Sequence, residues 1–135
     1  MGALHIGTDD DGSIRVPAAF SGVFGMKPTH GRVPAYSESP MGDLSHIGPI
    51  TRSVTDAALM LDTIARPDGR DWQSLPQEPR SFTTALDAGV SGLKVAWSCD
   101  PGFVNVDPEI HSLSARAAKR FQSLGVGLRE PRYPN

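Results

Sequence analysis

The sequence predicts an α/β fold, and three segments carry that prediction. Residues 93–97 have the composition of a strand, residues 107–125 the period of an amphipathic helix, and residues 126–129 the composition of a second strand. A strand, a helix and a strand at this spacing form the repeating unit of α/β proteins. A further helix is expected over residues 53–66, and an opening strand over residues 3–7.

Length, charge and cysteine content limit the class of protein. A chain of 135 residues suits one ordinary domain. The formal net charge of −2 argues against a nucleic acid or an anionic membrane as partner. No apolar run approaches the roughly 18 residues of a membrane-spanning helix. The single cysteine, Cys99, excludes an internal disulfide and fits a reducing compartment, so we expect a cytoplasmic protein.

The N-terminal part of the chain surrounds one tight turn, from Gly7 to Pro17, which reads G-T-D-D-D-G-S-I-R-V-P. The mostly apolar strand before it is typical of a central strand in a parallel sheet. Pro17 is expected at the first position of a short helical turn that ends before Gly22. A short extended piece over residues 31–34 follows, and residues 35–50 are expected to form a loop without regular structure.

The helix after this loop has clear start and stop signals. Ser53 is the expected N-cap, Asp56 favours the first turn, and Arg66 precedes the proline that ends the pattern. Its apolar stripe consists of Ala57, Ala58, Leu61 and Ile64. Residues 66–80, which include Trp72, are then expected to form a polar surface excursion.

The second half of the chain begins with one or two helical turns over residues 82–87 and continues with the strand–helix–strand unit. Asp107 is the expected N-cap of its helix, Pro108 occupies the first helical position, and the acidic Glu109 lies in the first turn. The apolar stripe of this helix is predicted to consist of Ile110, Leu113, Ala117, Phe121 and Leu124.

Several kinds of site are excluded by spacing. A calcium loop of the EF-hand type ending at the twelfth position would place Ala18 where a bidentate carboxylate is needed, so calcium binding is disfavoured. The chain contains no phosphate-binding loop, no dinucleotide glycine motif and no G-x-S-x-G elbow. The histidines are scattered without metal-ligand spacing. We therefore expect neither a metal nor an organic cofactor.

Ser13 is the remaining candidate for chemistry. A serine between a glycine turn and a helix start lies where backbone N–H groups converge, which suits a nucleophile that leaves negative charge on a carbonyl oxygen. A serine that only caps the following helix is the alternative from the residues alone.

The string G-T-D-D-D-G-S-I-R-V-P-A, followed by G-M-K-P-T and G-R-V-P, resembles the amidase signature family. The likeness continues through G-P-I-T-R-S-V-T-D-A-A-L-M-L-D and through V-D-P-E-I, so that it covers nearly the whole chain. The resemblance implies a partial amidase-signature core, with a mixed sheet and flanking helices, incomplete at both ends. Residues 1–135 would then be a fragment of a single amidase domain.

The resemblance also implies a reaction, the hydrolysis of a small-molecule carboxamide through an acyl-enzyme. Ser13 matches the family's nucleophile, and Asp9 and Arg15 match charged positions that brace the loop. The backbone N–H groups of Asp10, Asp11 and Gly12 match the oxyanion hole. In the family a lysine and a bridging serine activate the nucleophile, and both lie upstream of this segment. We therefore expect the isolated chain to be inactive, because a serine hydroxyl needs an adjacent base.

One position departs from the family pattern. Asp11 stands where the family has a glycine, directly in the oxyanion turn. If this position requires a positive φ, an aspartate adds backbone strain; if its carboxylate faces the site, it repels the oxyanion. This departure supports an alternative, in which the chain is a non-catalytic amidase-like subunit or interaction module. Exposed strand faces in an incomplete fold also make a homodimer possible.

Overall fold

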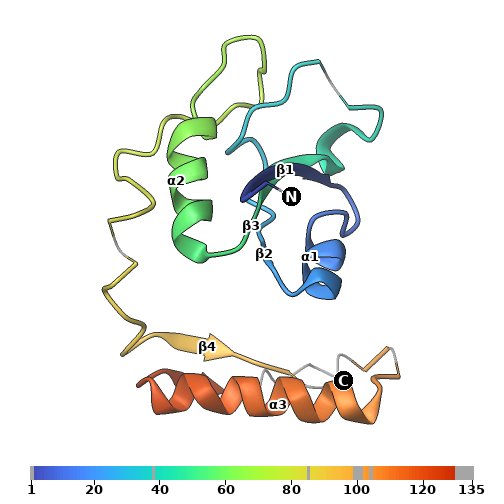
Figure 1. Cartoon of the computed structure of the whole chain (residues 1–135), viewed down its shortest axis with the longest axis vertical. Coiled ribbons are helices and arrows are strands. Elements are labelled where there is room, and N and C mark those ends of the chain that lie inside the picture. The colour runs from blue at the N-terminus through green and yellow to red at the C-terminus, as the bar shows by residue number, and fades with distance from the viewer. Residues whose placement is uncertain (1, 38, 85, 99–101, 104, 130–135) are drawn as a thin grey trace. The chain divides into compact units, whose positions relative to one another are not determined.

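The computed structural model describes residues 2–37, 39–84, 86–98, 102, 103 and 105–129. It divides into two compact units, Met1–Leu86 and Asp87–Asn135. Both units contain strands and helices (Figure 1), as the predicted α/β class requires. None of the helices in the described residues is long and apolar enough to cross a membrane.

A three-stranded antiparallel sheet forms the framework of the first unit. Its strands are β1 (Leu4–Asp9), β2 (Phe24–Gly25) and β3 (His46–Thr51), and their order in the sheet is β1–β3–β2. In the register between β1 and β3, Gly7 lies opposite Gly48 and Asp9 opposite His46. The turn that follows β1 therefore lies at the end of the sheet where β3 begins, because Asp9 is the last residue of β1 and His46 the first residue of β3.

The position of β1 corrects the prediction of a central parallel strand. Among the described strands β1 pairs only with β3, and the pairing is antiparallel. Residues 35–50 are also not a plain loop, because they contain a short 3₁₀ helix, η1 (Gly42–Leu44), and most of β3. The sequence does not indicate β3 because it contains Gly48 and Pro49, and both residue types usually mark turns rather than central strands.

Two helices complete the first unit and lie on either side of its sheet (Figure 1). The first, α1 (Arg15–Ser21), ends at Gly22, which has the left-handed conformation expected of a helix C-cap with φ 62°. It begins two residues earlier than predicted, so Pro17 is its third residue rather than its first. Proline is tolerated there because the N–H groups of the first turn have no partner within the helix.

The second helix, α2 (Val54–Ile64), packs against β3 and confirms the predicted start signal. The backbone N–H of Asp56 donates to Ser53 Oγ over 3.1 Å, and Ser53 Oγ donates to Asp56 Oδ2 over 2.7 Å. This reciprocal pair satisfies an N–H group that the helix itself leaves unpaired. The helix buries Ala57, Ala58 and Leu61.

The polar excursion after α2 is hydrogen-bonded to the segment that follows β2 in the same unit. The N–H of Leu75 donates to the Gly31 carbonyl over 2.9 Å, and the N–H of Ala35 donates to Asp71 Oδ2, also over 2.9 Å. Trp72 is 80% exposed, as expected for a surface segment. The expected short extended piece over residues 31–34 is a turn followed by a bend, and the described part of residues 82–87 forms turns rather than a helix.

The second unit is the predicted strand–helix–strand unit. It consists of β4 (Lys94–Ala96), α3 (Pro108–Ser123) and β5 (Gly127–Arg129), and the two strands pair in parallel. The N–H of Glu109 donates to Asp107 Oδ1 over 2.8 Å, which confirms the predicted cap.

The apolar stripe of α3 is placed differently from the prediction. Ala118 is the buried residue of α3, whereas the large side chains of the stripe are about half exposed: Ile110, Leu113, Phe121 and Leu124. Cys99, on which the expected reducing compartment depends, lies outside the described residues.

Candidate active site

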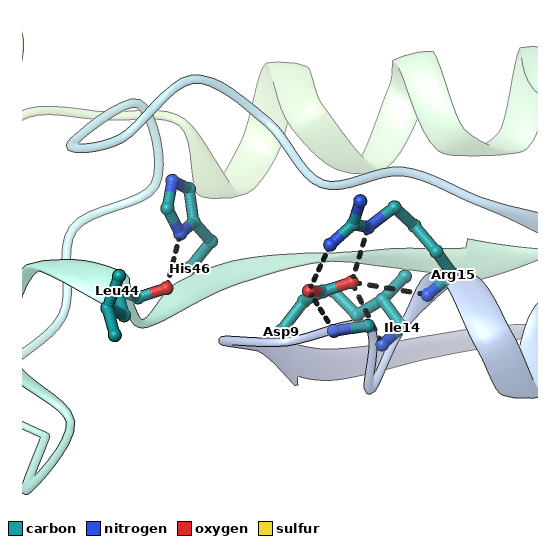
Figure 2. A network of polar contacts seen from close by, with 6 residues as sticks. Asp9, Ile14, Arg15, Leu44 and His46 are labelled. Carbon is teal, nitrogen blue, oxygen red and sulfur yellow. Dashed lines mark hydrogen bonds and ion pairs between the residues drawn. The ribbon is translucent and has the colours of Figure 1, made fainter. Parts of the chain in front are cut away.

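The turn between β1 and α1 is built around the carboxylate of Asp9. This side chain is completely buried and accepts hydrogen bonds at both oxygens (Figure 2). Backbone N–H groups reach it from Gly12 over 2.8 Å and from Ile14 and Arg15 over 3.2 Å each. The Arg15 guanidinium adds two further bonds of 3.0 Å, from Nε to Oδ2 and from Nη2 to Oδ1. The carboxylate thus ties together three residues of the turn.

The same contacts determine the charge state of the pair. Hydrogen bonds from the Arg15 side chain, and then from the backbone N–H groups, hold the pKa of Asp9 well below its ordinary value despite burial. In return, the hydrogen bond and charge of Asp9 raise the pKa of Arg15, and the charge of Asp11 adds to this effect. Because both oxygens of Asp9 already accept hydrogen bonds, this carboxylate is poorly suited to hold a cation.

Ser13 lies at the exposed tip of this turn. Within the described residues its hydroxyl forms no hydrogen bond, and the N-cap position of α1 is Ile14, without a side-chain cap. The structure therefore does not support the alternative that Ser13 caps the helix. The residue is exposed, and no lysine or histidine of the described part of the chain contacts its hydroxyl through a hydrogen bond.

The three residues predicted to form an oxyanion hole differ in their N–H groups. Gly12, at φ 127°, already donates its N–H to Asp9 Oδ1. The N–H groups of Asp10 and Asp11 have no acceptor among the described residues. No described non-glycine residue has a positive φ, so Asp11 occupies its position without that form of strain. Its side chain is exposed.

Two histidines that appear unrelated in the sequence lie together beside this turn. His46, opposite Asp9 in the sheet, meets His30 edge to face at a ring-centroid distance of 5.1 Å. Its Nδ1 pairs with the Leu44 carbonyl over 2.8 Å (Figure 2), and His30 Nε2 pairs with Gln73 Oε1 over 3.1 Å. The periodicity of the sequence contains no signal for this contact, because the two histidines lie on separate segments of the chain.

The cavity beside His30 is small. Its volume is about 30 Å³, and it is lined in part by Ala35, Ser39 and Asp43. A space of this size admits water but lies far below the roughly 300–1,000 Å³ of typical ligand pockets. Trp72 is not among the lining residues, although its neighbours Asp71 and Gln73 are.

Comparisons with known proteins agree on one family. The profile of the Amidase family matches residues 1–135. An acylamidase of Rhodococcus erythropolis is 40% identical over the whole chain, and a glutamyl-tRNA(Gln) amidotransferase subunit of Ligilactobacillus salivarius is 39% identical over 96% of it. The crystal structure of a bacterial aryl acylamidase of the amidase signature family superimposes on 96% of the chain with a TM-score of 0.86 and 36% identity.

These proteins are much longer than this chain. The match covers 29% of the Rhodococcus acylamidase, 27% of the glutamyl-tRNA(Gln) amidotransferase chain and 27% of the aryl acylamidase chain. The chain therefore spans less than a third of the length of the relatives it matches. Within that third, the turn that carries Ser13 is held to the sheet by Asp9 and leaves the serine hydroxyl exposed.

Proposed function

The chain belongs to the amidase family, and on that premise we propose that Ser13 is the nucleophile that hydrolyses a small-molecule carboxamide. The observation that carries the proposal is the exposed, unbonded hydroxyl of Ser13 on a turn fixed by a buried carboxylate. A nucleophile must be open to substrate and held in one place, and this arrangement supplies both conditions.

The proposed reaction has two steps. Ser13 Oγ attacks the amide carbonyl carbon while a base takes its proton, and the carbonyl oxygen becomes an oxyanion. The C–N bond then breaks, the amine leaves with a proton, and water hydrolyses the remaining ester. We assign the oxyanion to the N–H groups of Asp10 and Asp11, because the Gly12 N–H is already bonded to Asp9.

We propose that the base belongs to the complete amidase fold rather than to this segment. The chain spans 27–29% of its relatives, and no described lysine or histidine forms a hydrogen bond with Ser13. Without an adjacent base the hydroxyl keeps its ordinary weak nucleophilicity. Activity is therefore expected when the segment is joined to the rest of the fold, and the isolated chain is expected to hydrolyse no simple amide. We place this activity in the cytoplasm.

A chimera tests the proposal. Residues 2–129 replace the matched segment of the Rhodococcus acylamidase, and the purified chimera is treated with a fluorophosphonate probe and digested for mass spectrometry. Probe attachment is expected at Ser13, and Ser13→Ala is expected to abolish both labelling and amide turnover. Ser21→Ala is the matched control, since Ser21 is also exposed and lies on α1. Persistent labelling of the Ser13→Ala chimera would refute the assignment.

A non-catalytic amidase-like module is the second candidate. Two observations favour it, namely the acidic side chain of Asp11 in the oxyanion turn and the occupied N–H of Gly12. A folded chimera that binds amides but never acquires the probe would support this candidate. A homodimer is a separate expectation, based on the strand faces that an incomplete fold exposes. Light scattering tests it by measuring the molecular mass of the full chain in solution.

A further inference from the structure

Ile14, the residue directly after Ser13, is completely buried although its neighbours in the turn are exposed. It is among the largest side chains of the described structure to be fully removed from solvent. Removal of so much apolar surface from water stabilises the position of this side chain. The backbone at Ile14 therefore has an apolar anchor one residue from the proposed nucleophile.

The space for this side chain is created by three glycines, Gly7, Gly25 and Gly48, which we call the glycine socket. A Cβ atom at Gly7 would lie 2.9 Å from Ile14 Cγ1, and one at Gly48 would lie 3.1 Å from Ile14 Cδ1. A Cβ at Gly25 would lie 3.1 Å from Ile14 Cγ2. Such contacts are closer than ordinary van der Waals distances, so a side chain at Gly7 would have to displace Ile14 or be displaced by it. A Cβ at Gly25 or Gly48 would meet other atoms more closely still, Ala18 Cβ and the Met26 carbonyl oxygen, so Gly7 is the socket position that tests Ile14 most directly.

The socket belongs to the sheet and not to the turn. Gly7 and Gly48 are partners in the register of β1 and β3, and Gly25 lies on β2, so each strand contributes one glycine. Ile14 also donates its N–H to Asp9 Oδ2. The turn is thus attached to the sheet in two ways. The Ile14 side chain packs against the strands, and backbone N–H groups of the turn donate to the carboxylate of Asp9 at the end of β1.

We propose that Ile14 is the positioning residue for the Ser13 nucleophile, and that the glycine socket sets the height of the Ser13 backbone above the sheet. This inference rests on the proposed function, because it assumes that the place of Ser13 matters. A displacement of about 1 Å at a reacting atom can cost about a hundredfold in rate. Ile14 acts through the backbone and does not touch the reacting atoms.

The first test uses the full chain and needs no activity. Amide hydrogen exchange is measured by NMR for Gly12, Ile14 and Arg15, whose N–H groups bond to Asp9, and for α2 as a global reference. Ile14→Ala is expected to speed exchange in the turn by at least about tenfold relative to α2, and Ile14→Val by a smaller factor. Val16→Ala is the matched control, because Val16 is 53% exposed.

The second test is a rescue. Gly7→Ala should disturb the turn in the natural background, because the new methyl group meets Ile14 Cγ1. In the Ile14→Ala background that atom is gone, and the close neighbour that remains is Ile50 Cδ1 on β3, at 3.1 Å, so Gly7→Ala should affect turn exchange much less there. Equal effects of Gly7→Ala in both backgrounds would overturn the proposal, and so would turn exchange that changes only in proportion to α2. Should Ile14→Ala fail to fold, Ile14→Val and Gly7→Ala decide the matter by the same ratio of turn to α2 exchange.

In the acylamidase chimera, Ile14→Val is expected to lower kcat about fivefold or more while KM stays within about twofold. A change confined to KM would contradict a positioning role. The two proposals fail separately: turnover that survives Ser13→Ala removes the nucleophile assignment, whereas uncoupled exchange at Gly7 and Ile14 removes only the positioning role.

Discussion

The guanidinium of Arg15 approaches the carboxylate of Asp9 in a two-point arrangement, with Nε 3.0 Å from Oδ2 and Nη2 3.0 Å from Oδ1. Asp9 is fully buried, whereas the Arg15 side chain is 54% exposed. The pair is part of a larger hydrogen-bonded network, because the same two oxygens also accept the backbone N–H groups of Gly12, Ile14 and Arg15. Its main effect is therefore to hold the turn in one conformation. A charge-assisted acceptor with five donors stabilises the loop geometry in a way that a neutral side chain cannot.

Asp9→Asn should destabilise the chain at neutral pH. An amide cannot accept at both terminal atoms, so at least two of the five donors lose their acceptor, and the remaining bonds lose their charge assistance. The expected loss is on the order of 2–3 kcal/mol in the free energy of unfolding. Urea denaturation followed by circular dichroism measures it, with Asp10→Asn as the control. A loss equal to that of the control would contradict the role of Asp9.

The stabilising effect of Asp9 should disappear in acid. Its pKa is lowered in the folded chain, chiefly by Arg15, so its contribution is fully present above the pKa of an unfolded aspartate and is lost as the pH falls toward the folded pKa. Asp62 and Asp68 also have lowered pKa values, Asp68 to about 2, so total stability reports several groups. The difference between the natural chain and Asp9→Asn isolates Asp9. This difference should shrink from about pH 5 downward, and a constant difference would contradict the assignment.

Local signals in the sequence were sufficient for the elements that begin with caps. Ser53 and Asp107 mark α2 and α3 because a side-chain oxygen that satisfies free N–H groups acts over only two or three residues. The parallel pair of β4 and β5 follows from the helix between them. In each case the physical cause and the pattern lie in one short stretch of chain.

The remaining features depend on contacts between distant residues. Gly48 and Pro49 resemble a turn in the sequence, and their place in a strand depends on pairing with Gly7 and Ile6 of β1. Ile14, set among polar residues, shows no apolar period, and its burial follows from glycines that are 7, 11 and 34 positions away in the chain. The glycines at positions 7, 25 and 48 are the one feature of the sequence that relates to the burial of Ile14. That these three glycines lie close together can be recognised only from the register of the strands, and no single segment of the sequence specifies that register.

Ser53→Ala should weaken the start of α2. The variant removes the oxygen that accepts the Asp56 N–H over 3.1 Å and leaves the Asp56 carboxylate without its 2.7 Å partner. Loss of such a cap costs about 1 kcal/mol. Thermal unfolding should show a lower midpoint than in Thr55→Ala, a control at a neighbouring exposed position of the same turn. Equal midpoints in the two variants would show that the cap contributes nothing measurable.

Asp11→Gly should raise the rate of acylation in the acylamidase chimera, but only modestly. Asp11 is exposed and has no positive φ, so relief of strain contributes nothing and water screens its charge. Two unit charges about 4 Å apart in water repel by about 1 kcal/mol, which corresponds to about a fivefold change in rate. Single-turnover labelling of Ser13 by the fluorophosphonate probe measures this rate.

The matched variant for this measurement is Asp11→Asn, which removes the charge and keeps the side chain. If repulsion of the oxyanion is the cause, Asp11→Asn and Asp11→Gly accelerate labelling to a similar extent, and added salt reduces the difference from the natural chimera. An acceleration of about a thousandfold would instead mean that the carboxylate faces the oxyanion in a desolvated site, as two charges at an effective dielectric constant near about 20 would require. That result would contradict the exposed position of Asp11 and would move it into the oxyanion hole itself.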